Sequence, residues 1–225
     1  MIRCRFGDGW MDLAPSKIAC LLRNYAAHAE EMKNAVPEKV RFFLKPPSSL
    51  LADGGSIVIP DGVRNVHHEV EMALLIGKRG TCIPRSDSME YVKGFGVMLD
   101  ITARGIQTEA KKKGLPWSEA KGYDTFAPVG GVFATADDFD YRSKRIWLSV
   151  NGTIRQEGNT DLMLFQPPEI ISRISDVMIL EPGDLILTGT PAGVGELNAG
   201  DVVKAGVEGI CECCFNVVSK KPDHA

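Results

Sequence analysis

Two carboxylates, Glu69 and Glu71, stand two residues apart at the head of an apolar run that ends at Gly77. The run is short and contains valine and isoleucine, which predicts a β-strand over residues 65–77. Side chains two residues apart on a strand share a face, so both carboxylates enter one space, with His67 beside them. Such a pair repels unless a basic group or a divalent cation lies between. A solvent-facing strand edge is the alternative for this segment alone.

A third carboxylate, Asp100, ends a second predicted strand over residues 91–100. Acidic side chains at the ends of buried strands are well placed to meet neighbours from adjacent strands. Three carboxylates form an all-oxygen site, which suits Mg²⁺, Mn²⁺ or Ca²⁺ better than zinc. We therefore expect Glu69, Glu71 and Asp100 to bind Mg²⁺ or Mn²⁺ in a catalytic site.

A histidine and a glutamate at helical spacing form the next candidate pair. Residues 26–32 are rich in helix formers and contain neither glycine nor proline. His28 and Glu31 are three residues apart, so they share a face of this helix and can hydrogen-bond. An ordinary exposed pair on a surface helix is the alternative interpretation.

Candidate substrate-binding groups follow Asp100. A helix is predicted over residues 102–114, closed by Gly114, and it places Arg104 and Gln107 on one face near the acidic strand end. A basic and an amide group there can hold a substrate carboxylate or carbonyl. Residues 111–113, three lysines, are predicted to be a solvated turn at the helix C-terminus. Lys121 falls in a predicted loop, where a lone lysine is usually a surface charge.

Length and composition narrow the classes of function. The chain has 225 residues, enough for a substantial core, and a formal net charge of −3, which gives no reason to expect a nucleic-acid partner. We find no apolar segment long enough to span a membrane and no signal-peptide core, so a cytoplasmic location is expected. The six cysteines are expected to be reduced. Cys211, Cys213 and Cys214 offer a zinc site as an alternative, without a second pair at zinc spacing.

Short strands dominate the rest of the chain. The dipeptide Asn151–Gly152 is the strongest hairpin signal, and residues 168–175 form a predicted amphipathic helix. The glycine-rich residues 189–195 lack the ending of a P-loop and the spacing of a dinucleotide fingerprint. About ten strands with few helices predict a β-dominated α+β fold.

Four segments together resemble the fumarylacetoacetate hydrolase family, and most closely its small single-domain acylpyruvases and oxaloacetate decarboxylases. They are residues 67–77, 99–104, 112–117 and 187–195, in the order of the family. The resemblance covers about residues 17–218. It implies the family's mixed β-sandwich roll, a homodimer, and a single catalytic domain at 17–218 after a strand and turn at 1–16, with a frayed tail at 219–225. Leu22 departs from the family, whose members often have glycine there.

The resemblance also implies roles for individual residues. His28 would be the general base for a water, with Glu31 as its orienting partner. Lys121 would neutralise charge on an enolate oxygen, and Thr190 would donate a hydrogen bond to the substrate carboxylate. Lys45 would lie near the site as a supporting group.

These expectations predict a metal-dependent hydrolase that cleaves acylpyruvates to pyruvate and a carboxylic acid through a metal-stabilised enolate. Oxaloacetate decarboxylation is the close alternative, because it shares the enolate and needs no water. Isomerisation or decarboxylation of an unsaturated dicarboxylate is a third enzymatic possibility. From a different class, the carboxylates could hold a structural Ca²⁺ in a non-catalytic module.

Overall fold

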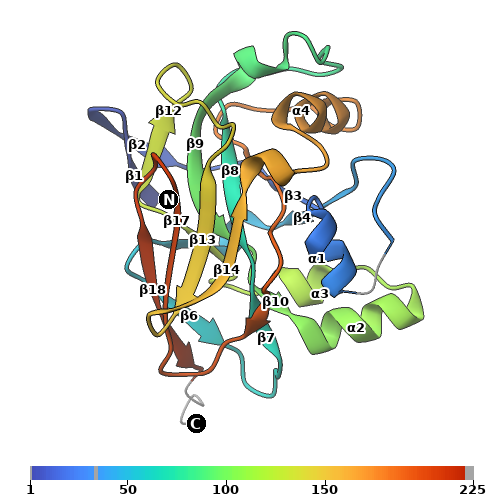
Figure 1. The fold of residues 1–225 in the computed structure, drawn as a ribbon, viewed down its shortest axis with the longest axis vertical. Coiled ribbons are helices and arrows are strands. Elements are labelled where there is room, and N and C mark those ends of the chain that lie inside the picture. Colours follow the sequence, from blue (N-terminus) through green and yellow to red (C-terminus); the bar gives the residue numbers. More distant parts are fainter. Residues whose placement is uncertain (1, 33–34, 221–225) are drawn as a thin grey trace.

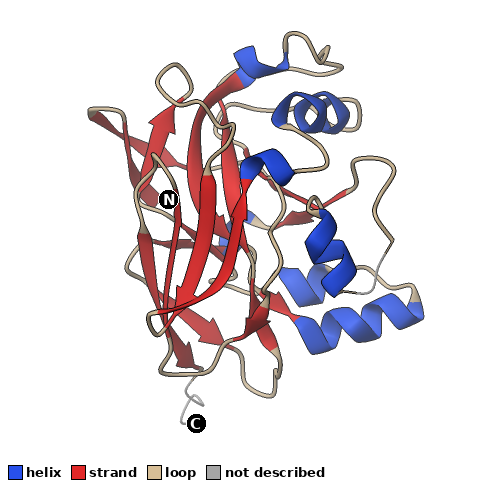
Figure 2. Cartoon of the chain, viewed as in Figure 1, coloured by secondary structure: helices blue, strands red, loops and turns tan. Residues whose placement is uncertain are grey.

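Strands make up most of the regular structure in the computed structural model, and the helices gather on one side of them (Figures 1 and 2). The structure describes residues 2–32 and 35–220. The strands are β1 (Ile2–Phe6), β2 (Gly9–Leu13), β3 (Ile18–Leu21), β4 (Phe42–Lys45), β5 (Leu50–Ala52), β6 (Ser56–Ile59), β7 (Val66–His68), β8 (Val70–Ile76), β9 (Val92–Leu99), β10 (Thr102–Ala103), β11 (Ala127–Val129), β12 (Val132–Thr135), β13 (Arg145–Val150), β14 (Thr153–Asn159), β15 (Leu185–Leu187), β16 (Gly195–Glu196), β17 (Val202–Val207) and β18 (Cys213–Ser219). The helices are α1 (Ala26–Glu31), α2 (Arg104–Lys113), α3 (Ser118–Lys121) and α4 (Pro167–Ser175), with short 3-10 helices η1 (Pro47–Ser49), η2 (Ser88–Tyr91) and η3 (Thr160–Leu162).

Three sheets organise these strands. The largest has ten strands, with the path β2-β1-β12-β9-β8-β15-β3-β4, and β11 and β5 join it through β9. A five-stranded sheet has the order β14-β13-β17-β18-β6, and a small third sheet has the order β10-β7-β16. Parallel and antiparallel pairs occur in the same sheets, as in β15 with β3 and β15 with β8. The β-dominated α+β fold predicted from the sequence is confirmed.

Strand β8 lies at the centre of the core and is buried on both faces. Met72 and Leu74 belong to a large cluster shared with strands of the five-stranded sheet and with α4. Ala73 and Leu75, on the other face, belong to a second cluster shared with β3 and β15. Because both faces are covered, a solvent-facing edge is excluded for β8. The carboxylate at its start, Glu71, is held in the interior.

The single strand predicted over residues 65–77 is wrong in one respect. The segment is divided at Glu69 into β7 and β8, which belong to different sheets. β7 pairs with β10 and β16, whereas β8 pairs with β9 and β15. Thr102 and Ala103, predicted as the start of a helix, form β10 for the same reason, since they pair with β7. Helix α2 therefore begins at Arg104.

The ends of other predicted elements are as the sequence indicates. β13 and β14 form an antiparallel hairpin around Asn151 and Gly152, with φ values of 52° and 79°. Such left-handed values at both turn positions are typical of a two-residue hairpin. Gly114 closes α2 with a φ of 65°.

The remaining fold predictions concern the two ends of the chain and the division into domains. β18 runs to Ser219, and residues 221–225 lie outside the described part, so the frayed tail stays a prediction. The division into an extension at residues 1–16 and a catalytic domain at 17–218 also stays a prediction. Among the described residues, no helix has the length and apolarity needed to cross a bilayer.

Candidate active site

Three buried carboxylates converge where β7, β8 and β9 end. Glu69 lies between β7 and β8, Glu71 is the second residue of β8, and Asp100 directly follows β9. The backbone N–H of Asp100 donates to the carbonyl of Glu69 at 2.8 Å, which joins the two strand ends. One oxygen from each carboxylate lies within 4.8 Å of the others. The structure therefore brings together the three residues predicted as metal ligands.

Three cationic side chains surround two of these carboxylates. Lys121 Nζ lies 3.0 Å from Glu69 Oε2 and also contacts Asp100 Oδ2. Lys45 Nζ lies 2.6 Å from Asp100 Oδ1, and an Arg104 guanidinium nitrogen contacts Glu69 Oε1. Burial raises the pKa of Glu69, but Lys121 and Arg104 outweigh it and hold that pKa well below its ordinary value. Glu69 is therefore a charged, compensated carboxylate.

The loop predicted around Lys121 is wrong, because this residue is the last of helix α3 and is 2% exposed. α3 packs against α2 and β10, so its last turn carries the side chain into the interior. Burial lowers the pKa of Lys121, but Asp100 and Glu69 more than offset it and the pKa is raised. Lys121 is thus a charged group at the carboxylates, and its predicted contact with substrate stays a prediction.

Glu71 differs from the other two carboxylates because no cationic side chain pairs with it among the described residues. Its one hydrogen-bond donor there is the backbone N–H of Gly189, at 2.5 Å. Burial, and then the charges of Asp100 and Glu69, raise its pKa well above the ordinary value. A buried carboxylate without compensation calls for a cation, and an all-carboxylate donor set suits a hard divalent metal. The residues fit Mg²⁺ or Mn²⁺.

Helix α1 carries the predicted base over the pocket. His28 Nδ1 lies 3.5 Å from Glu31 Oε2, and His28 is buried. Both oxygens of the Glu31 carboxylate accept from the backbone N–H of Gly193 at 3.1 Å, which fixes the carboxylate beside the histidine. Burial lowers the pKa of His28, so its imidazole is neutral near pH 7. The two predicted residues lie side by side, although His28 Nδ1 makes no hydrogen bond with a described residue. Their catalytic role stays a prediction.

Asn24 holds the start of α1 against the rest of the site. Its side-chain amide donates to the carbonyls of Thr188 and Phe165 at 2.7 and 2.9 Å and accepts from the Phe165 N–H at 2.7 Å. Gly189, with a φ of 92°, passes so close that an added Cβ would lie 2.6 Å from the Cβ of Asn24. Only glycine fits here, and it places its N–H on Glu71. Leu22, the departure from the family, lines the same pocket.

Arg104 and Gln107 lie together at the start of α2. An Arg104 Nη1 donates to Gln107 Oε1 at 2.7 Å, and both side chains line the pocket. His67, predicted beside the carboxylates, lies in β7, and burial and then Arg104 lower its pKa to about 4. Its Nδ1 is buried without a hydrogen-bond partner among the described residues.

A series of hydrogen bonds behind the pocket determines whether the Thr190 hydroxyl donates or accepts. Gln156 Oε1 accepts from the backbone N–H of Val70 at 3.1 Å, which identifies that atom as the oxygen. Its Nε2 therefore donates to Thr190 Oγ1 at 2.7 Å and to the Pro191 carbonyl at 2.9 Å. Because Thr190 Oγ1 accepts, and no described residue accepts its hydrogen, the hydroxyl is free to donate into the pocket. His68 Nδ1, 2.9 Å from Gln156 Oε1, carries a hydrogen by the same reasoning.

No pattern in the sequence marks Gln156, which lies in a strand with mostly exposed neighbours yet is itself fully buried. The pocket that these groups surround has a volume of about 430 Å³, counting space open to solvent. It is lined by Leu21, Leu22, Arg23, His28, Met32, Phe43, Glu69, Glu71, Arg104, Gln107, Lys111, Trp117, Lys121 and Thr190. Seven of the nine predicted site residues thus line one pocket, together with residues that sequence reasoning did not select. The other two, Asp100 and Glu31, contact the lining residues Lys121 and His28.

Residues 111–113 are exposed in the last turn of α2, as the sequence predicts. Lys111 also lines the pocket, and its ammonium group lies 5.1 Å from the centre of the Trp117 ring. Gln107 is one helical turn before Lys111, so the two share a face of α2. That spacing was the signal in the sequence. Lys112 and Lys113 are exposed and pair with Glu109, as predicted for the turn.

The cysteine alternative finds no support. All six cysteines are free, and burial raises the pKa of the Cys4 thiol to about 11. Within residues 2–32 and 35–220, the one group of three or more metal-ligating side chains is Glu69, Glu71 and Asp100.

Comparisons with known proteins show which family this chain belongs to. A family model described as fumarylacetoacetate (FAA) hydrolase C-terminal matches residues 17–218. A protein of Arabidopsis thaliana named mitochondrial oxaloacetate tautomerase is 49% identical over 202 residues, 90% of this chain and 91% of the relative. A protein of Dictyostelium discoideum named mitochondrial oxaloacetate decarboxylase is 46% identical over 207 residues, 91% and 95% of the two chains. The crystal structure of fumarylpyruvate hydrolase from Pseudomonas aeruginosa with Mn²⁺ and pyruvate has a TM-score of 0.89 and 32% identity, covering 97% of this chain and 95% of that one.

Proposed function

The chain belongs to the fumarylacetoacetate hydrolase family, and from that premise we propose that it is a divalent-metal-dependent enzyme acting on short 2-oxo acids. One observation carries the proposal. Two of the three clustered carboxylates, a charged lysine and a neutral histidine line a single pocket, and the third carboxylate, Asp100, contacts that lysine. The carboxylates suit a metal, the lysine suits developing negative charge, and the histidine suits proton transfer.

Glu69, Glu71 and Asp100 would hold the metal, Mg²⁺ or Mn²⁺, and when bound it would supply Lewis-acid polarisation of the substrate's carboxylate and ketone oxygens. The chain's own groups bind the same end of the substrate. The Thr190 hydroxyl donates to the carboxylate, and Lys121 stabilises the negative charge that develops on the ketone oxygen as an enolate forms. These interactions strengthen as charge develops, so they lower the barrier to enolisation.

His28 moves the proton. Its imidazole is neutral and is fixed beside Glu31, so it can take a proton from the carbon next to the ketone or from a water. Proton removal from carbon and its return gives keto–enol tautomerisation. Removal of a proton from water gives a nucleophile. The same pair therefore serves two reactions, and the substrate decides between them.

Oxaloacetate is the first substrate that we propose. Its support comes from relatives named oxaloacetate tautomerase and oxaloacetate decarboxylase, which are 46–49% identical over about nine-tenths of this chain. In tautomerisation His28 exchanges the carbon proton, and in decarboxylation carbon dioxide leaves without a base.

Hydrolysis of acylpyruvates is the second candidate, supported by the His28–Glu31 pair and by the likeness to fumarylpyruvate hydrolase. Water, deprotonated by His28, attacks the distal carbonyl. The bond between that carbon and the next one breaks, its electrons form the enolate of pyruvate, and a carboxylic acid leaves. A homodimer and a cytoplasmic location are further parts of the proposal, which sedimentation and fractionation would check.

A metal-supplemented substrate panel tests the proposal. Metal-free enzyme receives Mg²⁺ or Mn²⁺ and then oxaloacetate, acetylpyruvate or an unsaturated dicarboxylate, with products resolved as enol, pyruvate plus carbon dioxide, or pyruvate plus acid. We expect metal-dependent turnover. His28→Asn should lower tautomerisation and hydrolysis roughly 100-fold or more and decarboxylation far less.

Two results would contradict this account. Equal losses of decarboxylation and hydrolysis in His28→Asn would show that His28 is not the proton acceptor. A metal that raises the melting temperature without turnover of any 2-oxo acid would favour a structural ion site. Glu30→Gln, on the exposed face of the same helix, is the matched control and should behave as the native enzyme.

A further inference from the structure

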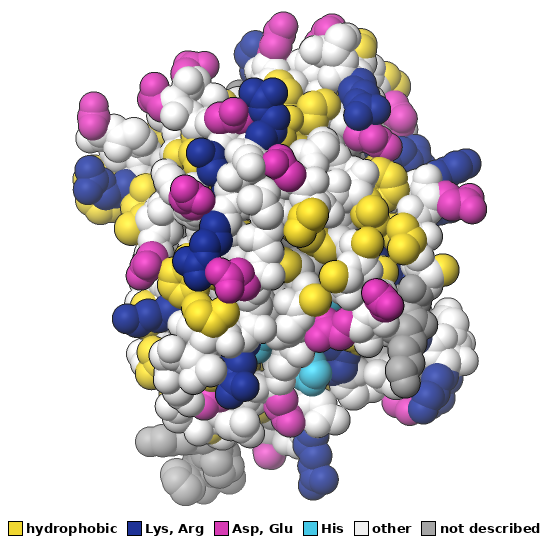
Figure 3. All heavy atoms as spheres, in the orientation of Figure 1, with side chains coloured by type: hydrophobic (Ala, Val, Ile, Leu, Met, Phe, Trp, Pro, Cys, Tyr) yellow, Lys and Arg dark blue, Asp and Glu magenta, His cyan; other side chains and the backbone are white. Residues whose placement is uncertain are grey.

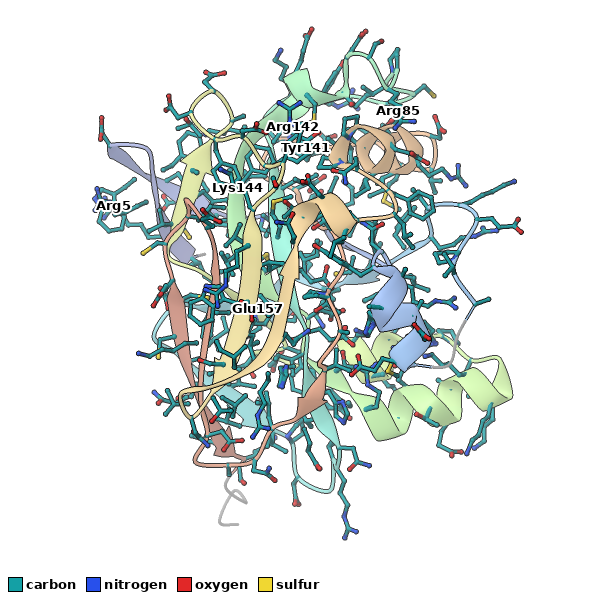
Figure 4. The ribbon with its side chains drawn as sticks, in the orientation of Figure 1. Arg5, Arg85, Tyr141, Arg142, Lys144 and Glu157 are labelled. Atoms are coloured by element: carbon teal, nitrogen blue, oxygen red, sulfur yellow. The ribbon has the colours of Figure 1, made fainter. Side chains whose placement is uncertain are left out.

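Two cations at the pocket, Arg23 and Lys111, have no role in the site described so far. Both line the pocket with Glu69 and Lys121. Neither has a carboxylate partner within ion-pair distance in the described part of the chain. Many other cations do, including Arg85 with Glu169, and Arg142 with Asp140, on the outer surface (Figure 4). The face drawn in Figure 3 likewise mixes side chains of both charges, without a field of one sign.

Each cation is held in place without being neutralised. Arg23 has a φ of 55°, a left-handed conformation that residues other than glycine rarely adopt, and it directly precedes the anchored Asn24. Its one hydrogen bond to a described residue is a donation from Nη1 to the Ala35 carbonyl at 3.2 Å. Lys111 lies over the ring of Trp117, a contact that orients an ammonium group and leaves its charge intact.

The two cations also repel one another. Burial, and then the charges of Arg104 and Arg23, lower the pKa of Lys111. Arg104 is already paired with Glu69, so among the described residues the cations that line the pocket without a carboxylate partner are Arg23 and Lys111. Like charges gathered in a pocket attract a counter-ion from outside, and the field in a partly desolvated cleft is stronger than on open surface. A ligand carboxylate would remove the repulsion.

We propose that Arg23 and Lys111 form a second anion subsite, which binds the far carboxylate of a 2-oxo dicarboxylate. This inference rests on the proposed function, because it assumes that the near carboxylate and ketone face Glu69, Glu71 and Asp100. It specifies the substrate class: a 2-oxo acid with a carboxylate at each end is preferred to an acylpyruvate whose far end is neutral.

The subsite also ranks the reactions. Loss of carbon dioxide moves the carboxylate's negative charge onto carbon, so cations that stabilise the carboxylate raise the barrier to that loss. Arg23 and Lys111 therefore disfavour decarboxylation of oxaloacetate at the carboxylate they bind. They favour reactions that retain it, which are tautomerisation of oxaloacetate and hydrolysis of an acylpyruvate with an acidic end.

A matched pair of unreactive ligands tests the subsite independently of turnover. 2-Oxoglutarate and 2-oxopentanoate have the same chain length and differ in the far carboxylate. Calorimetric Kd values are measured on Mn²⁺-loaded native enzyme, Lys111→Met, Arg23→Gln and Lys112→Met, the last a control on the exposed face of α2. We expect Lys111→Met and Arg23→Gln each to weaken 2-oxoglutarate roughly tenfold to 100-fold and 2-oxopentanoate less than threefold. Lys112→Met should change neither.

The outcomes separate the two proposals. Equal weakening of both ligands, or unchanged affinity for 2-oxoglutarate, would overturn the subsite, whatever the enzyme turns over. If the native enzyme turned over no 2-oxo acid but the variants lost 2-oxoglutarate selectively, the proposed reaction would fail and the subsite would stand. Thermal melting of each variant confirms that it is folded before its Kd is used.

Discussion

Asp184 and Glu71 are both 1% exposed, yet their surroundings are opposite. Asp184 directly precedes β15, and its oxygens accept from the backbone N–H groups of Ser16, Lys17 and Glu181 and from the side chains of Ser16 and Lys17. Glu71 accepts from one described donor, the N–H of Gly189.

The difference separates a structural carboxylate from one kept available for a ligand. Asp184 ties together the starts of β3 and β15, two adjacent parallel strands, and its capacity to accept hydrogen bonds is used within the chain. Glu71 has unused capacity in the interior, where an unsatisfied charge is costly. Such a cost persists where a ligand compensates it, which makes under-satisfied burial a sign of function.

Glu71→Gln should show the largest difference between Glu71 and Asp184, in turnover and in the free energy of unfolding. We expect turnover with saturating Mn²⁺ to fall about 1,000-fold or more, because a neutral amide is a poor ligand for a hard cation. The free energy of unfolding of the metal-free protein should stay equal or rise, since a buried, uncompensated charge has been removed. Urea unfolding and metal-saturated kinetics measure both quantities.

The control for this change is Glu109→Gln on the exposed face of α2, which should alter neither quantity. If Glu71→Gln kept turnover within tenfold of native, or destabilised the metal-free protein by more than about 2 kcal/mol, Glu71 would be a structural residue of the same kind as Asp184.

Asp184→Asn should show the reverse pattern. An asparagine places an N–H₂ group against donors that Asp184 now accepts from, and it removes the ion pair with Lys17. We expect a loss of about 2–4 kcal/mol in the free energy of unfolding, with kcat/KM per folded molecule within about twofold of native. Asp140→Asn, in an exposed pair with Arg142, should leave the urea midpoint unchanged. A fall in kcat/KM with normal stability would refute the assignment.

Local patterns predicted much of the fold because they depend on neighbours in sequence. The hairpin at Asn151 and Gly152 needs left-handed backbone at both turn positions, which those residues adopt readily. The break at Glu69 was not predictable in this way. It arises because β7 pairs with β10 and β16, and only tertiary structure decides which sheet a continuous apolar run joins.

The same distinction, between local patterns and tertiary contacts, applies to the residues of the site. Spacing and strand ends predict Glu69, Glu71 and Asp100, and helical spacing predicts the His28–Glu31 and Arg104–Gln107 pairs. Family resemblance supplies Lys121 and Thr190. Lys111 is exposed like its two neighbours, as the sequence predicts, but only the tertiary structure places it at the pocket and over the Trp117 ring. Gln156 was missed, since its partners Val70 and Thr190 are remote in sequence and nothing local marks a buried glutamine.

The pH dependence of kcat/KM tests the pairing of the proposed base, His28, with Glu31. Burial lowers the pKa of His28 below the ordinary 6.5, while Glu31 raises it. The neutral imidazole is the active form, so kcat/KM should be level near pH 7 and fall only as the pH drops below 6.5. Glu31→Gln removes the stabilising charge, so the acid limb should move to lower pH while the plateau falls about tenfold. An acid limb that moved to higher pH would contradict the pairing, and Glu30→Gln should leave the profile unchanged.

Gln156, like Asp184, has its hydrogen-bonding groups satisfied within the chain, but one of its partners, Thr190, lines the pocket. Gln156 therefore tests whether a fully hydrogen-bonded buried side chain always has a structural role. Gln156→Glu keeps an acceptor for the Val70 N–H and removes the donations to Thr190 and to the Pro191 carbonyl. The Thr190 hydroxyl should then turn from the pocket toward the new carboxylate. We expect KM to rise roughly threefold to tenfold with little change in kcat, as Thr190→Val should also produce. Because both act through one hydroxyl, the double variant should be no worse than either single one.

Gln166→Glu is the control, since that amide donates to backbone carbonyls away from the pocket, and its KM should stay native. Additive effects in the double variant would mean that Gln156 does not orient Thr190. It would then belong with Asp184, as a residue whose saturated hydrogen bonds serve the fold alone.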